Sequence, residues 1–243
     1  MQTIYYNGLV FTGALPLVQA FSVRDGRFAA VGSQEDVLAT VQEGDALVDL
    51  RGRFACPGFN DSHMHLLGYG SNRECCALSA HTSSLRDMQE ALRAFAASRP
   101  WPEEAWIRGR GFNEDFFAEH SGLPTRHDLD AVTTRYPVCV VRCCGHCLVV
   151  NTRALTLLGL DGTQPQPAGG HYDVDEHGFP TGVFRDNAMS MVYACLPSPT
   201  RADIGRMLRD ACASLNRFGI TSVHTDDLRT FENVDYREVL AAY

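Results

Sequence analysis

Two histidines one residue apart, His63 and His65, are the residues of this chain best suited to chemistry. In an extended strand alternate side chains leave on the same face, so both imidazoles can point together while Met64 turns away. Two neutral imidazoles side by side provide two ligands for a divalent metal ion. A bare His-x-His pair is usually ordinary, but here Pro57 and Gly58 break the chain just before it.

A carboxylate, Asp61, lies two positions before His63, on the same face of the predicted strand. It could orient an imidazole from behind, as carboxylates do around many metal sites. It could equally serve only to form the turn. Both interpretations stay open.

The first 55 residues predict part of a small β-sandwich, because short runs of β-branched and aromatic residues are separated by turn residues. Asp25 and Gly26 form a two-residue hairpin turn, since both positions tolerate a positive φ. A short helical turn is expected over residues 34–41. The predicted strands cover residues 4–11, 18–23, 28–31 and 46–50.

From residue 54 onward strands and helices alternate, which is typical of βα units and a parallel sheet. Ser84, Asn151 and Thr200 each precede a segment with helical spacing, in the position of an N-cap. A hairpin is expected around His177, and another helix from residue 234. The predicted strands cover residues 54–56, 106–109, 138–144 and 220–224, and the helix after Thr200 carries an apolar stripe of Ile204, Leu208, Ala211, Cys212, Leu215 and Phe218.

The segment from Phe54 to Leu66 resembles the first barrel strand of the metal-dependent amidohydrolase superfamily, and several further motifs match in order. More narrowly, the chain is similar to the branch called amidohydrolase family 3, or YtcJ-like. The resemblance implies a composite β-sandwich, of which residues 1–55 form a part, followed by a TIM-type (β/α) barrel over residues 56–243. An eight-unit barrel needs ~250 residues. We count about four βα units, so the expected fold is α/β with a partial barrel that corresponds to the N-terminal half of the family.

The resemblance also assigns roles to residues that follow the predicted strands, where barrel active sites gather. His63 and His65 match the family's first metal ligands. His146, in a Gly-His…Asn segment, matches a residue that lines the substrate pocket. Asp186 stands where relatives commonly carry a glutamate facing the metal centre, and His224 ends the fourth strand, so both are catalytic candidates.

Plainer roles remain open for each of these weaker candidates. His146 could be a buried structural histidine, and Asp186 could be a carboxylate at a helix start. Asp186 is one methylene shorter than glutamate, which makes a bridge between two metals doubtful. Asp226 and Asp227 could simply cap the helix that follows them.

The charge and hydropathy of the sequence indicate which partners and which location to expect. With a net charge of −8 and no long basic run, nucleic acid is not an expected partner. The sequence has neither a secretory-type leader nor an apolar run near the ~20 residues of a membrane span, so we expect a cytoplasmic protein without a membrane partner.

The nine cysteines are expected to be reduced thiols, most of them packed as small apolar side chains. A structural zinc held by Cys143, Cys144, His146 and Cys147 is a weaker alternative. It lacks a second Cys/His pair at a usual spacing.

The leading prediction is a metal-dependent hydrolase acting on non-peptide C–N bonds of a small amide-type substrate, with this chain as its N-terminal portion. A bound zinc-like ion would lower the pKa of water and polarise the scissile carbonyl. The alternative is a non-catalytic metal-binding half-barrel, or assembly module, that needs a complementary chain. Because a half-barrel has open strand edges, we expect self-association or a requirement for a complementary C-terminal fragment.

Overall fold

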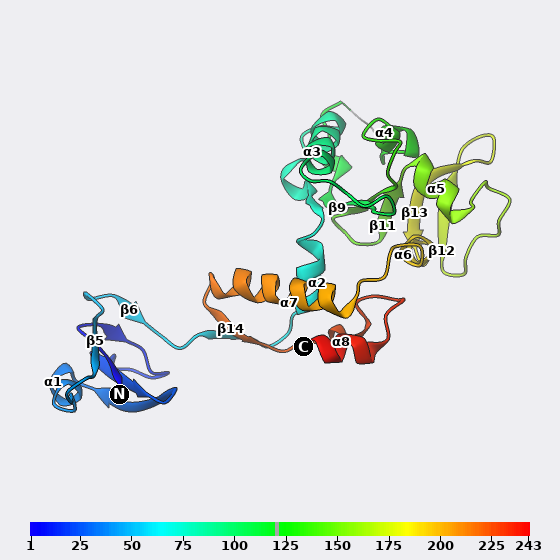
Figure 1. Cartoon of the computed structure of the whole chain (residues 1–243). Coiled ribbons are helices and arrows are strands. Elements are labelled where there is room, and N and C mark those ends of the chain that lie inside the picture. The colour runs from blue at the N-terminus through cyan, green and yellow to red at the C-terminus, as the bar shows by residue number, and fades with distance from the viewer. Residues whose placement is uncertain (120–121) are drawn as a thin grey trace. The chain divides into compact units, whose positions relative to one another are not determined.

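The computed structural model describes residues 1–119 and 122–243, which divide into two compact units (Figure 1). The first unit is Met1–Asp61 together with Phe218–Ser222. The second is Ser62–Arg217 together with Val223–Tyr243. Each unit therefore contains segments that are far apart in the sequence.

The first unit contains a four-stranded sheet in the order β4-β3-β1-β5. Its elements are β1 (Thr3–Tyr6), β3 (Ala20–Arg24), β4 (Arg27–Gly32), α1 (Gln34–Leu38) and β5 (Ala46–Asp49). Strand β1 pairs antiparallel with β3 and parallel with β5. Asp25 and Gly26 join β3 to β4 with φ values of 53° and 72°, so the predicted hairpin is confirmed. Helix α1 closes a small core of Ile4, Ala20 and Val37.

Two short strand pairs complete the first unit. Strand β2 (Leu9–Val10) pairs parallel with β6 (Phe54–Ala55), and β7 (Phe59–Asp61) pairs with β14 (Ile220–Val223). The strand expected over residues 54–56 therefore does not lead into the histidines, because Pro57 and Gly58 separate it from β7. The strand that precedes His63 is β7.

A six-stranded sheet in the order β12-β13-β11-β10-β9-β8 is the centre of the second unit. Strands β9 and β10 are parallel, as predicted, and β8 is parallel to β9, but β11, β13 and β12 run antiparallel. The expected parallel sheet therefore accounts for only part of this sheet, because short turns join β10 to β11 and β12 to β13, and only antiparallel neighbours accept such turns. The bounds are β8 (Cys76–Ala77), β9 (Ile107–Phe112), β10 (Val138–Arg142), β11 (Cys147–Val150), β12 (Gly170–Val174) and β13 (Pro180–Asp186).

The turn between β12 and β13 is the hairpin predicted around His177, closed by a bond of 2.8 Å from the Asp175 amide to the Phe179 carbonyl. The fold is mixed α/β, as predicted at that level. The strands of the described residues form no closed barrel.

Apolar side chains on both faces of this sheet pack against helices. Alternate strand residues explain the division, because Val138 and Val140 face one cluster while Cys139 and Val141 face the other. Helices α3 and α4 contribute to the first cluster, and α5 and α6 to the second. The helices are α2 (Leu66–Asn72), α3 (Leu85–Ala97), α4 (Arg126–Asp130), α5 (Thr152–Leu158), α6 (Met189–Tyr193), α7 (Arg201–Asn216) and α8 (Tyr236–Ala242), with 3₁₀ turns η1 (Leu78–Ala80), η2 (Glu114–Phe116) and η3 (Asp227–Arg229).

The predicted helix starts are confirmed. The side chains of Ser84, Asn151 and Thr200 accept hydrogen bonds from amides in the first turns of α3, α5 and α7. The predicted stripe of α7 is wrong at two positions, because Cys212 is exposed and Phe218 lies beyond the helix end with 71% of its surface exposed.

Candidate functional site

His63 and His65 lie side by side, although not in a strand. Both belong to the loop between β7 and α2, and both are exposed. Their ring centroids are 5.4 Å apart with an angle of 77° between the ring planes. The loop therefore brings together the two imidazoles that the sequence analysis proposed as metal ligands.

The orientation of His65 is fixed by a carboxylate from a distant segment. Its Nδ1 lies 2.9 Å from Oδ1 of Asp226 and 3.7 Å from Oδ1 of Asp227. A histidine that uses Nδ1 in this way presents Nε2 for coordination. Asp226 thus has the position of a carboxylate that orients a metal-binding histidine.

Asp227 anchors the loop. Its side chain is 2% exposed, and it accepts hydrogen bonds from the Leu67 amide at 2.6 Å, from the Tyr243 hydroxyl at 3.1 Å and from the Thr225 hydroxyl. The Thr230 hydroxyl donates a further bond at 3.2 Å. Asp227 therefore caps the first turn of α2, and not the helical turn that follows it.

Burial and hydrogen bonding act on Asp227 in opposite directions. Burial acts to raise the pKa of its carboxyl, but the hydrogen bonds from Thr225 and Leu67, with those from Tyr243 and Thr230, outweigh it and hold the pKa below its usual range. Burial beside this carboxylate raises the pKa of Tyr243 to about 12. Asp227 is consequently an ionised acceptor whose neighbours remain donors.

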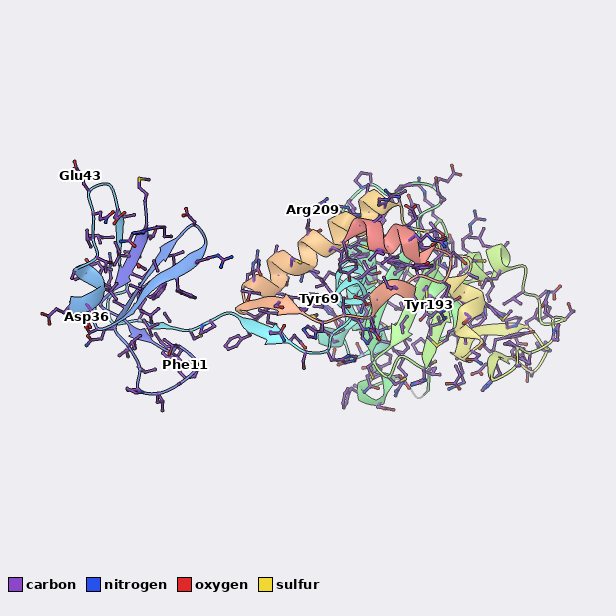
Figure 2. All side chains as sticks on the ribbon, turned by 90° about the horizontal axis from the view of Figure 1, so that it is seen from below. Phe11, Asp36, Glu43, Tyr69, Tyr193 and Arg209 are labelled. Atoms are coloured by element: carbon purple, nitrogen blue, oxygen red, sulfur yellow. The ribbon has the colours of Figure 1, made fainter. Side chains whose placement is uncertain are left out.

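Helix α2, which follows the histidines, is also held against α7. The hydroxyls of Tyr69 and Ser214 are 2.9 Å apart, and Nη1 of Arg73 donates to Ser214 at 3.1 Å (Figure 2 labels Tyr69). The helix after the histidine loop is thus held at its first turn by Asp227 and further along by Ser214 of α7.

His224 contributes its backbone to this arrangement. Its carbonyl accepts a hydrogen bond of 3.0 Å from the Met64 amide, between the two histidines. The imidazole is exposed and has no hydrogen bond or ion pair with any other described residue. His224 thus lies at the end of β14, where the sequence placed it, and links this segment to the histidine loop.

His146 and Asp186 form a second pair. Nδ1 of His146 lies 3.4 Å from Oδ1 of Asp186, and the Asp186 amide donates to the His146 carbonyl at 3.0 Å. Both side chains are exposed, so His146 is not a buried structural histidine. Asp186 has a positive φ of 50°, and it does not cap a helix, because the N-cap of α6 is Ala188.

Metal ligation within this chain is limited. In residues 1–119 and 122–243, no group of three or more His, Cys, Asp and Glu side chains is arranged to hold one metal ion. His63 and His65 supply two ligands, whereas catalytic zinc sites have three from the protein. His63 and His65 therefore fit a divalent metal ion, but only as part of a larger set of ligands.

The cysteine motif does not form a structural zinc site among these residues. Cys147 is buried in the core, where burial raises its pKa to about 11, while Cys143 and Cys144 are exposed. The backbone N–H of His146, together with Arg142, lowers the pKa of the Cys144 thiol. All nine cysteines are free, and Cys76, Cys139 and Cys147 are the buried ones.

Asp226 as the partner of His65 was not predicted from the sequence, and neither were Arg108 and Arg110 in β9. A signal for Asp226 existed, because it follows a predicted strand within His-Thr-Asp-Asp. The arginines alternate in a strand and so point to one face, which the pattern alone could have indicated.

The mixed α/β fold and the exposed His-x-His loop can be compared with known families. The sequence matches the amidohydrolase family over residues 46–241, and the chain belongs to this family. The predicted recognition is confirmed.

Individual relatives give the same picture. The chain is 31% identical to the protein YtcJ of Bacillus subtilis (strain 168), covering 96% of this chain and 44% of YtcJ. It is 30% identical to the N-substituted formamide deformylase of Arthrobacter pascens, covering 72% of this chain and 32% of that enzyme. The chain thus spans less than half the length of these relatives.

A solved structure is similar over the whole chain. An uncharacterized metal-dependent hydrolase from Pyrococcus horikoshii OT3 superposes with a TM-score of 0.71 at 26% identity, covering 100% of this chain and 45% of that one.

Among the described residues, no helix combines the length and apolarity needed to cross a membrane.

Proposed function

We propose that this chain forms the N-terminal part of a metal-dependent hydrolase that cleaves non-peptide C–N bonds in small amide-type substrates. The observation that carries the proposal is the His63–His65 pair, 5.4 Å between ring centroids, with His65 oriented by Asp226. It lies in the segment that matches the amidohydrolase family.

His63 and His65 would hold the metal, and zinc is the ion we propose because imidazole suits it. When bound, such an ion lowers the pKa of a water molecule and polarises a carbonyl group. Asp226 keeps Nδ1 of His65 engaged, so Nε2 would be the atom that holds the ion. Removal of carboxylates in this position costs 10- to 100-fold in metal affinity in other proteins.

Proton transfer and substrate contact are proposed for the remaining candidates. Asp186 accepts the proton of the attacking water and passes it to the leaving nitrogen, and His224 assists as the second catalytic group. His146 donates to the substrate from beside Asp186. The 3.4 Å contact holds His146 and Asp186 together, and both side chains are exposed.

The fold proposal follows the family. Residues 1–55 form the N-terminal part of a composite β-sandwich, and residues 56–243 form about four βα units of a TIM-type barrel. The parallel strands β8, β9 and β10 support the barrel assignment. We propose a cytoplasmic protein that self-associates or pairs with a complementary C-terminal fragment.

Metal binding tests the proposal. Equilibrium dialysis against Zn²⁺ should give one weakly held ion per chain, and His63→Ala or His65→Ala should abolish it, because each removes half of the ligands. His177→Ala is the matched control, since His177 is an exposed histidine in the β12–β13 hairpin. One tightly held zinc that survives in His63→Ala would refute the site.

The second candidate function is a non-catalytic metal-binding module that needs a complementary chain. It is favoured by the finding that the described residues offer two clustered metal ligands and no third. The isolated chain should then hydrolyse N-formyl and N-acyl amines at background rates. Robust metal-dependent turnover that His65→Ala abolishes would exclude this candidate and show a catalytically complete chain.

A further inference from the structure

A cavity of about 550 Å³ lies within the second unit and includes the strand face from which Arg108 and Arg110 project. Strands β9 and β10 form part of its wall, since Arg108 pairs in register with Cys139 and Arg110 with Val141. The rest of the wall is formed by α2 and the residues after it, by the end of α6 and the segment that follows, by the first half of α7, and by the end of η3 and the segment after it. The histidines of the proposed metal site are not among its lining residues.

The charges lining the cavity do not cancel. Its ionisable lining residues that are charged at neutral pH are four arginines and three carboxylates, namely Arg108, Arg110, Arg206 and Arg229 with Glu74, Asp203 and Glu232. The lining therefore carries one surplus positive charge. A cavity with such a surplus favours a singly charged anion.

The surplus is concentrated on two residues. Arg206 forms ion pairs with Glu74 and, at 3.3 Å, with Asp203, and Arg108 lies 4.0 Å from the same Glu74. The side chains of Arg110 and Arg229 have no hydrogen bond or ion pair with any residue in 1–119 or 122–243. Two guanidinium groups in one cavity are thus left with donors to offer.

The remaining lining is largely apolar. Trp106, Val141, Leu196 and Phe231 contribute side-chain surface, and Tyr193 on α6 adds a ring (Figure 2 labels Tyr193). Burial raises the pKa of the Tyr193 hydroxyl, which therefore stays protonated and able to donate. Apolar walls with a few convergent polar groups are typical of small-molecule sites.

We propose that this cavity binds a small monocarboxylate with an apolar body, whose carboxylate is received by Arg110 and Arg229. The planar guanidinium fork matches the two oxygens of a carboxylate and forms charge-assisted hydrogen bonds with them. Glu74 and Asp203 disfavour a doubly charged group such as phosphate, because they would repel its second charge.

Arg110 also relates this cavity to the proposed substrate residue. Its Nη2 lies 3.8 Å from the place that a Cβ on Gly145 would occupy, and Gly145 directly precedes His146. The carboxylate site goes beyond the hydrolytic proposal, because binding there requires neither a metal ion nor turnover.

Calorimetric titration of the metal-free full chain with phenylacetate tests the proposal. We expect saturable one-site binding, at least tenfold weaker for the neutral analogue phenylacetamide and weaker for phenyl phosphate. Arg110→Gln and Arg229→Gln should each raise the Kd for phenylacetate about tenfold or more, since each removes a charged partner. Arg110→Lys, which keeps the charge without the fork, should give an intermediate Kd.

Arg209→Gln is the matched control, because Arg209 is an exposed arginine on α7 outside the cavity lining (Figure 2). It should leave the Kd unchanged, and none of these variants should alter the melting temperature, since none removes an ion pair. Absence of phenylacetate binding, tighter binding of phenyl phosphate, or equal Kd values for Arg110→Gln and Arg209→Gln would each overturn the proposal. A failure of metal binding at His63 would not affect this result, so the two proposals are distinguishable.

Discussion

Replacing Asp227 by alanine should destabilise the second unit strongly. The carboxylate is 2% exposed and joins three separate parts of the chain. It accepts hydrogen bonds from Leu67 in α2, from Tyr243 at the end of α8, and from the hydroxyls of Thr225 and Thr230 nearby. The N-cap residue of α2, His65, makes no capping bond itself, and the Thr225 hydroxyl accepts only a longer bond of 3.3 Å from the Leu66 amide.

The size of the effect follows from these contacts. Loss of a helix cap costs about 1 kcal/mol, and a buried donor left without an acceptor costs about 1–3 kcal/mol. Since the hydroxyls of Thr225 and Thr230 can turn to other acceptors, we expect the free energy of unfolding to fall by about 3 kcal/mol in Asp227→Ala. Asp227→Asn keeps an oxygen acceptor but not the charge, so about half of that loss is expected.

Urea unfolding at pH 7, followed by circular dichroism, measures the difference. Asp226→Ala is the matched control, because the side chain of Asp226 is 69% exposed. This variant should change the free energy of unfolding by no more than about 0.5 kcal/mol. Equal stabilities for the two alanine variants would refute the assignment of Asp227 as the anchor of the histidine loop.

The pH dependence gives an independent check. Hydrogen bonds hold the pKa of Asp227 in the folded chain below its ordinary value of 3.8. A group with a lowered folded-state pKa contributes stability above its unfolded pKa and loses it as the pH falls through the folded value. The stability gap between the natural chain and Asp227→Asn should therefore be constant from pH 7 to about pH 5, and should shrink below about pH 4. A gap that widens with acid would contradict this reasoning.

Two further predictions concern the fold. Asn151→Ala should lower the free energy of unfolding by about 3 kcal/mol, because the buried side chain accepts from the Val138 and Ala154 amides and donates to the Thr133 and Tyr136 carbonyls, all at 3.0 Å. Asn216→Ala, at an exposed position, is the control. Equal urea midpoints for the two variants would contradict this prediction. Sedimentation should show self-association, since β8 pairs on one side only and leaves an open strand edge in the sheet. A monodisperse monomer with cooperative unfolding would show that this edge is protected.

The sequence by itself determined the local structure, because the interactions responsible span only a few residues. Ser84, Asn151 and Thr200 begin helices through bonds to amides three positions ahead. Asp25 and Gly26 make the predicted turn because both accept a positive φ. The family could likewise be recognised from the histidine segment, since His63 and His65 are neighbours in the sequence.

Only the tertiary structure decided what surrounds those histidines and how the later strands run. The Asp227 carboxylate meets the Leu67 amide across 160 positions, and no local pattern specifies a contact at that distance. The antiparallel direction of β11 and β13 depended on which strands become neighbours. A run of apolar residues in the sequence does not specify its neighbouring strand. Chemistry-bearing residues could thus be named from their types and spacing, but their partners are set by long-range packing, because that is where burial and strand pairing are decided.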